Sequence, residues 1–293
     1  MKKLKYILLG LLPILLAVSI QFLVSLPVMA VSLLRALQNM AYDTSFEVFY
    51  NDLLRSWTGP GFTSVISLLY SICALILFAI WYQSSFHALD VNRLPSHFNG
   101  KLLIGILCLM PGLQYLTTYL VQFVSVLRPQ WLETYTKLLD TAGLNDITPA
   151  LALYAVLFGP ICEELIFRGV TMSYAKRALP FWAANLFQAL MFGIYHMNML
   201  QGVYAFFVGL FLGYICHKTG SIFPSMLLHI AFNSFGTFTG GLFMYRADQP
   251  FFFFLWLLVG IVLTFLGIRL VNSAAKALNP GNASKVLQDS SDM

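Results

Sequence analysis

Residues 149–169 read PALALYAVLFGPICEELIFRG, an apolar run long enough to cross a lipid bilayer as a helix. Within it lie Glu163, Glu164 and Arg168. An ionisable side chain inside a bilayer costs roughly 2.5–3.5 kcal/mol on insertion scales unless it has a partner. Two later apolar runs also carry polar groups: MFGIYHM at 191–197 contains His196, and LLHIAFN at 227–233 contains His229 and Asn233. Three stretches of membrane-spanning sequence therefore contain groups suited to chemistry.

The composition places the whole chain in a membrane. Hydrophobic residues make up 59% of the 293 residues and charged residues 10%, whereas soluble domains carry about 25% charged residues. Apolar runs that can span a bilayer lie at 6–34, 62–82, 102–127, 149–167, 181–200, 202–216, 221–238 and 252–271. We therefore predict an all-α fold, a polytopic membrane helical bundle of about eight transmembrane helices.

We divide this bundle into three parts. Residues 1–149 provide about three N-terminal transmembrane helices with their loops, and residues 150–237 form the core helices that carry the candidate site. Residues 238–293 provide the last transmembrane helix and a polar tail. The first run also resembles a secretory signal, because lysines precede it and PVMA follows, but the length of its apolar stretch favours a retained helix.

The distribution of basic residues predicts how the chain is oriented. With eight crossings, twelve Lys and Arg residues fall on the side of the two termini and five on the other side. The first set is Lys2, Lys3, Lys5, Arg93, Lys101, Arg168, Lys176, Arg177, Lys218, Arg269, Lys276 and Lys285, and the second is Arg35, Arg55, Arg128, Lys137 and Arg246. This excess favours a multi-pass plasma-membrane protein with both termini in the cytoplasm. The net charge of +5 is spread along the chain, which argues against a nucleic-acid surface.

Helix geometry predicts that the three polar stretches meet at one depth. If the turn between the fourth and fifth crossings falls near Pro180, Glu164 and His196 are each 16 positions from it, about 24 Å along their helices. Further turns near Gln201 and Thr219 bring His229 to within about one helical turn of the same level. We expect these groups to line one cavity, open toward the cytoplasm.

Spacing within each stretch divides the work between its residues. Glu164 and Arg168 are four residues apart and can form an ion pair on one helix face, which leaves Glu163 free to act as a base. His229 and Asn233 have the same spacing, so that both side chains can donate hydrogen bonds toward a developing oxyanion. Each pair alone is also compatible with a purely structural role in the bundle.

The three patterns E-E-x-x-x-R (163–168), F-x-x-x-H (192–196) and H-x-x-x-N (229–233) occur in this order on successive membrane helices. Together they resemble the CAAX protease and bacteriocin-processing (CPBP or Abi) family, also called type II CAAX prenyl endopeptidase-like, over roughly residues 150–237. The resemblance implies an intramembrane endopeptidase that acts on membrane-associated peptides or proteins. It implies that Glu163 activates water, that His196 orients it, that His229 and Asn233 form the oxyanion hole, and that Glu164 and Arg168 support the site.

The same resemblance leaves metal dependence open. If zinc is bound, Glu163, His196 and His229 are the expected ligands, since three N or O ligands and a water form an ordinary catalytic site. The chain lacks the H-E-x-x-H pattern, and none of His87, His97 and His217 is placed to assist, so a mechanism without metal is slightly favoured.

Other functions are compatible with the sequence. The main alternative is a non-catalytic immunity or regulatory protein that binds a membrane partner such as a sensor kinase. An inverted repeat would favour a third function, a transporter that uses buried acids as a proton relay, and the sequence contains no such repeat. The four cysteines lie in apolar runs without CxxC spacing and are expected to be free thiols, with Cys162 as a second candidate nucleophile. No pattern identifies the substrate, for which bacterial relatives of the family suggest peptide or bacteriocin maturation.

Overall fold

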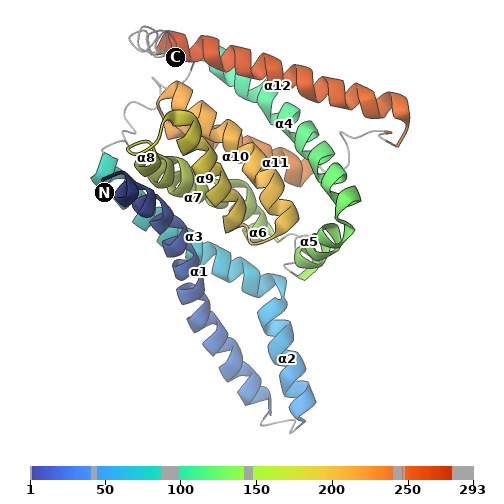
Figure 1. Ribbon diagram of the computed structural model, residues 1–293. Coiled ribbons are helices and arrows are strands. Elements are labelled where there is room, and N and C mark those ends of the chain that lie inside the picture. Colours follow the sequence, from blue (N-terminus) through green and yellow to red (C-terminus); the bar gives the residue numbers. More distant parts are fainter. Residues whose placement is uncertain are drawn as a thin grey trace.

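A computed structural model describes residues 2–40, 45–86, 99–141, 148–239, 246 and 248–278. All regular structure in these segments is helical, which confirms the predicted all-α membrane bundle (Figure 1). The separate helices are α1 (Lys2–Met40), α2 (Phe46–Thr58), α3 (Pro60–Phe86), α4 (Gly100–Leu127), α5 (Pro129–Thr141), α9 (Phe181–Tyr195), α10 (Met199–Thr219), α11 (Ile222–Thr239) and α12 (Pro250–Leu278). One further helix is continuous but changes its winding, through α6 (Pro149–Leu153), η2 (Tyr154–Phe158), α7 (Gly159–Glu163), η3 (Glu164–Thr171) and α8 (Met172–Ala175).

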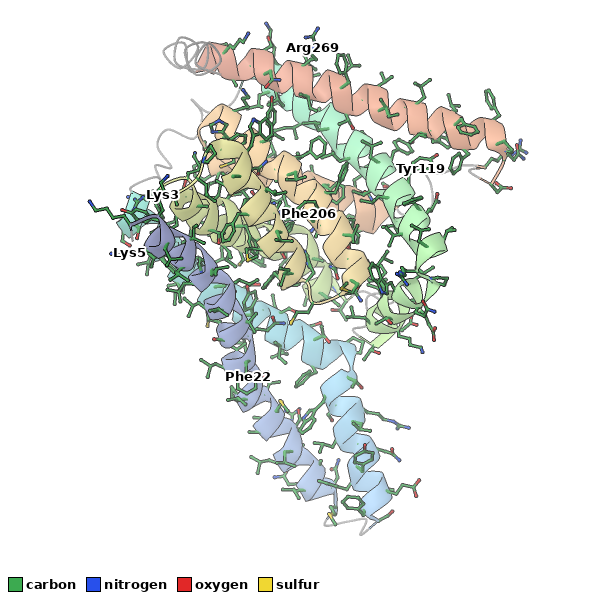
Figure 2. All side chains as sticks on the ribbon, viewed as in Figure 1. Lys3, Lys5, Phe22, Tyr119, Phe206 and Arg269 are labelled. Atoms are coloured by element: carbon green, nitrogen blue, oxygen red, sulfur yellow. The ribbon has the colours of Figure 1, made fainter. Side chains whose placement is uncertain are left out.

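Six helices of the described chain are long and apolar enough to span a membrane. They are α1, α3, α4, the composite helix Pro149–Ala175, α10 and α12. Their outer faces expose large apolar side chains, for example Phe22 of α1, which is 63% exposed and is labelled in Figure 2. Such faces suit contact with lipid, because a soluble protein rarely exposes extended apolar surface.

The other two expected crossings are the shorter helices α9, which is followed directly by His196, and α11, which contains His229. Helix α9 has 15 residues, or about 22 Å, which is less than the roughly 30 Å of a bilayer core. The expected crossing 181–200 is therefore wrong at its end, because α9 stops at Tyr195 and α10 begins at Met199. Met197 has a positive φ of 49°, and the Asn198 side chain caps α10 by accepting the Gln201 N–H at 3.0 Å. The turn thus lies at 196–198 rather than near Gln201.

The composite helix is the centre of the bundle, with α1 and α3 packed on one side and α9, α10 and α11 on the other (Figure 1). Helices α4 and α12 form a pair that covers α10 and α11. Close approach of α9 and α10 depends on glycine, since a Cβ atom on Gly202 would lie 2.9 Å from the Gly193 carbonyl oxygen. This contact brings the end of α9, with His196, against the start of α10.

Candidate active site

The backbone around the two adjacent glutamates is not a regular α-helix. Wider π-helical segments precede and follow α7, and such segments are frequent at functional sites. Pro160 has no N–H group to donate, and the Gly159 N–H donates to the carbonyl of Tyr154. The carbonyl of Ala155 therefore lacks its usual helical donors, and the Asn233 side chain supplies one instead, with Nδ2 donating to it at 3.0 Å. The irregular winding thus ties α11 to the composite helix beside the candidate site.

Glu164 and Arg168 form an ion pair inside the bundle. Arg168 Nη1 donates to Glu164 Oε1 at 2.8 Å, and both side chains are 0% exposed. The His229 imidazole lies against the same carboxylate oxygen, with its Nδ1 3.0 Å from Glu164 Oε1. Because a carboxylate oxygen only accepts, this contact places the Nδ1 hydrogen between them. The pair therefore fixes the orientation of the His229 ring.

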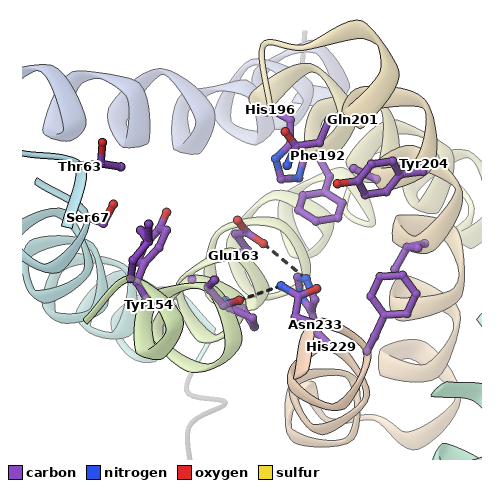
Figure 3. A pocket seen from close by; sticks show the side chains of 17 residues that line it. Thr63, Ser67, Tyr154, Glu163, Phe192, His196, Gln201, Tyr204, His229 and Asn233 are labelled. Atoms are coloured by element: carbon purple, nitrogen blue, oxygen red, sulfur yellow. Dashed lines mark hydrogen bonds and ion pairs between the residues drawn. The ribbon is translucent and has the colours of Figure 1, made fainter. Parts of the chain in front are cut away.

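Of the two adjacent glutamates, Glu163 is the one whose side chain faces open space. Its side chain is 12% exposed, and its Oε2 lies 3.5 Å from Nε2 of His229. The carboxylate lines a cavity of about 240 Å³ together with Phe192, His196, His229 and Asn233. Figure 3 shows these side chains around one space, with His196 on the wall formed by the end of α9. The structure thus brings Glu163, His196, His229 and Asn233 to one cavity, with Glu164 and Arg168 directly behind it.

Phe192 forms the wall between the two histidines. The centre of its ring is 5.0 Å from that of His196 and 5.7 Å from that of His229. The Arg168 guanidinium lies over the same ring, 4.5 Å from its centre, which is a favourable cation–π position. Phe192 therefore packs against both imidazoles as well as against the buried ion pair.

Several residues of the cavity were not predicted from the sequence. Tyr154, Gln201 and Tyr204 add polar groups from the composite helix and from α10, and Thr63 and Ser67 line the cavity from α3. Thr63 and Ser67 belong to the N-terminal part of the chain, where the sequence contains no motif. A buried network behind Arg168 was also missed, in which Gln188 Nε2 and Arg168 Nη2 both donate to the Gly209 carbonyl, at 2.9 and 3.4 Å.

The cavity lies closer to one end of the bundle than expected. Its lining includes Thr63, Leu151 and Gln201, which are within the first four residues of α3, of the composite helix and of α10. The start of α1 and the end of α12 lie at the other end of the bundle, where α3, the composite helix and α10 finish (Figure 1). The expected opening toward the cytoplasm stays a prediction, and the position of the cavity argues against it if the two termini are cytoplasmic. Helix arithmetic predicts the depth of the groups but not the side on which the packed side chains leave space.

The other candidates from the sequence do not reach this cavity. The Cys162 thiol is buried and contacts the Ser71 carbonyl, with Sγ 3.6 Å from that oxygen, so it is not placed as a nucleophile. His217 stacks on Phe181 with ring centres 3.7 Å apart. His87 and His97 lie outside the described residues.

The described side chains do not form a ready three-ligand metal site. Within the described segments, no group of three or more His, Cys, Asp or Glu residues is placed to hold one metal ion. His229 directs one nitrogen to each of two carboxylates, and Glu164 is already engaged by Arg168. The arrangement of Glu163, His196 and His229 therefore does not fit the tetrahedral ligand set expected for catalytic zinc.

Comparison with known proteins agrees with the motifs. Residues 145–235 match the family model described as type II CAAX prenyl endopeptidase Rce1-like. Searches of curated proteins and of solved structures found no match. The matched region contains the composite helix, α9, α10 and most of α11, and therefore all six predicted site residues.

Proposed function

Since residues 145–235 place the chain in the type II CAAX prenyl endopeptidase (Rce1-like) family, we propose that it is an intramembrane endopeptidase. We propose that it hydrolyses a peptide bond in a membrane-associated peptide or protein. One observation carries this proposal: Glu163 lines a cavity that it shares with His196 and His229, whereas Glu164 is neutralised behind it. A carboxylate free to accept a proton beside a water-sized space is what hydrolysis by general base catalysis requires.

His229 lies between the two carboxylates. Its Nδ1 is 3.0 Å from Glu164 Oε1, and its Nε2 is 3.5 Å from Glu163 Oε2. A hydrogen on Nδ1 is donated to Glu164, because a carboxylate oxygen only accepts, and His229 also lines the cavity. The proposed role in the oxyanion hole requires a second hydrogen, on Nε2.

The proposed reaction uses these groups in order. Glu163 accepts a proton from a water molecule that His196 orients, and the oxygen of that water attacks the carbonyl carbon of the substrate. The resulting oxyanion accepts a hydrogen bond from His229 Nε2. The carbon–nitrogen bond then breaks, and the proton held by Glu163 passes to the leaving amine, which gives a carboxylic acid and an amine as products.

Asn233 can take part while it keeps its structural contact. One hydrogen of its amide group bonds the Ala155 carbonyl, and the amide has a second hydrogen that can serve the oxyanion. Its position on the cavity wall beside His229 supports this second role. In this proposal Asn233 both holds α11 against the composite helix and donates a hydrogen bond to the oxyanion of the transition state.

We place the protein in the plasma membrane with both termini in the cytoplasm, a proposal supported by the excess of basic residues at that end. Its partners are the lipid bilayer and a membrane-associated polypeptide substrate. The competing proposal is a non-catalytic immunity or regulatory protein, which would bind a membrane partner without cleaving it.

A double substitution separates these two proposals. Glu163→Gln with His196→Ala removes both groups that act on water, while the Glu164–Arg168 pair stays in place. We expect a strain with this variant to behave like a deletion strain and to lose the new polypeptide amino termini that the wild-type protein generates in its membranes. Amino-terminal mass spectrometry and immunoblotting of membrane levels measure this. A wild-type phenotype from the double variant would show that the protein works by binding.

Metal removal provides a separate prediction. In the proposed reaction Glu163 and His196 activate water without a metal ion. Purified protein in detergent should therefore keep its activity after thorough chelation. Metal analysis should give less than one ion per chain. Stoichiometric zinc, with activity lost on its removal and restored on its return, would contradict this and would identify Glu163, His196 and His229 as the ligands to test.

A further inference from the structure

The ends of seven helices meet in one region of the bundle, which we call the basic end. The start of α4 belongs to it, because the Asn99 side chain donates from Nδ2 to the Ala274 carbonyl of α12 at 3.5 Å. The Arg177 guanidinium lies 4.7 Å from the ring centre of Phe86 and 5.7 Å from that of Tyr6, which joins the end of α3 and the start of α1 to the end of α8. Phe181 at the start of α9 stacks on His217 near the end of α10. The Tyr214 hydroxyl of α10 donates to the side chain of Asn272 in α12 at 2.7 Å.

Charge is distributed very unevenly between this end and the opposite one. Nine Lys and Arg residues of the described chain belong to the basic end: Lys2, Lys3, Lys5, Lys101, Lys176, Arg177, Lys218, Arg269 and Lys276. The described part of this end contains no Asp or Glu. The opposite end has five described basic residues, Arg35, Arg55, Arg128, Lys137 and Arg246, and five acidic ones, Glu47, Asp52, Glu133, Asp140 and Asp248. The positive-inside rule assigns the basic end to the cytoplasm.

The cavity extends from Glu163 toward the opposite end. Thr63, Leu151 and Gln201 lie at the starts of their helices there, and Glu163 is 14 residues beyond Pro149, about 20 Å along the composite helix. On the cytoplasmic side of Glu163, every residue from Glu164 to Thr171 is buried. The same packed segment contains the ion pair and Phe167, whose ring centre is 5.1 Å from that of Phe192. The helix that bears Glu163 is therefore closed toward the cytoplasm and open away from it.

The mouth of the cavity adjoins further polar space at the same end. A groove of about 450 Å³ between α2, α3 and α5 shares Thr63 with the cavity and is also lined by Thr58, Thr134 and Thr141. A second hollow of about 560 Å³, with Gln114 and Thr117 of α4 in its wall, shares Tyr204 and Asn233 with the cavity. The Oε1 atom of Gln114 is buried and has no hydrogen-bond partner in the described structure. Hydroxyl and amide groups in such a path suit the backbone of an extended polypeptide.

We propose, on the basis of the endopeptidase function above, that the site is reached from the non-cytoplasmic side of the membrane. Its substrate is a polypeptide segment exposed on that side, next to a membrane-spanning or membrane-bound part of the same molecule. A polypeptide tail presented by the cytoplasm would meet the closed, basic end of the bundle. The proposal thus sets the class of substrate by the side on which its cleavable bond lies.

Thiol labelling tests this without any measurement of cleavage. Thr63→Cys places a thiol in the cavity wall, and Thr141→Cys places one on the exposed end of α5 in the adjoining groove. Lys101→Cys places a matched thiol on the exposed basic end. Intact cells are treated with a cationic, membrane-impermeant methanethiosulfonate, the protein is purified, and its mass is compared with that of the wild type, which carries the four native cysteines.

We expect the cysteines at positions 63 and 141 to be labelled in intact cells, and the cysteine at position 101 only after the membrane is permeabilised. Position 141 keeps the test valid if the variant at position 63 fails to accumulate. Labelling at 101 but not at 63 or 141 in intact cells would overturn the proposal, as would equal labelling at all three positions. Because no cleavage is measured, these outcomes do not depend on whether the protein is a protease.

Discussion

Purified Glu163→Gln protein is expected to cleave its substrate with a kcat lowered by roughly 10²- to 10⁴-fold, the range that a general base contributes. Gln retains the shape of the side chain and can still contact Nε2 of His229, which lies 3.5 Å from the Glu163 carboxylate. It cannot accept the proton of the attacking water. Since the change concerns proton transfer in the transition state, KM should change much less than kcat. Initial rates over a range of substrate concentrations separate the two constants.

Glu133→Gln is the matched control for this substitution. Glu133 lies on α5 and its side chain is 64% exposed, where it pairs with Lys137 through a 2.6 Å contact. Loss of this carboxylate should leave kcat and thermal stability unchanged, because exposed ion pairs contribute little. A Glu163→Gln protein that is well folded and retains full activity would remove Glu163 from the mechanism and, with it, the proposed reaction.

The buried ion pair and the spanning helix that carries it could be predicted from the sequence because both follow from the spacing of residues along one helix. The four-residue spacing of Glu164 and Arg168 predicts the buried pair, and the structure contains it at 2.8 Å. The apolar length of residues 149–167 predicts a spanning helix, and the composite helix Pro149–Ala175 occupies this position. Both predictions depend only on the order and spacing of residues along one helix.

Features that depend on contacts between distant segments could not be predicted in this way. The π-helical winding leaves the Ala155 carbonyl without a helical N–H donor. The Asn233 side chain can replace that donor only because α11 packs against the composite helix. Thr63 and Ser67 enter the cavity because α3 lies beside the composite helix, although neither is part of a recognisable motif. The turn after Tyr195 was misplaced because the apolar residues Met197, Met199 and Leu200 were counted as part of the preceding run, although His196 and Asn198 interrupt it. The break between α9 and α10 is made by the positive φ of Met197 and by the Asn198 side chain, which caps α10.

Stability should depend on Glu164 and Arg168 as a pair rather than on either residue alone. Arg168→Met leaves the Glu164 carboxylate in the bundle without its cation, and breaking a buried pair in this way typically costs about 3–5 kcal/mol. Replacing both partners, as in Glu164→Gln with Arg168→Met, removes the buried charges together and should restore most of the lost stability. Thermal unfolding of the wild type, the two single variants Glu164→Gln and Arg168→Met, and the double variant in detergent gives the coupling energy as a double-mutant cycle.

Lys137→Met controls for the loss of a cation as such, because it breaks the exposed pair with Glu133 on α5 and should leave the unfolding temperature unchanged. The double variant should nevertheless remain a poor enzyme, since Gln at position 164 replaces the charged acceptor of the His229 Nδ1 hydrogen with a weaker, neutral one. Restored stability with low kcat would assign the pair both to folding and to positioning of His229. If Arg168→Met alone were as stable as the wild type, the ion pair would not hold the bundle together. If the double variant recovered full activity as well, the Glu164 charge would not be needed to position His229.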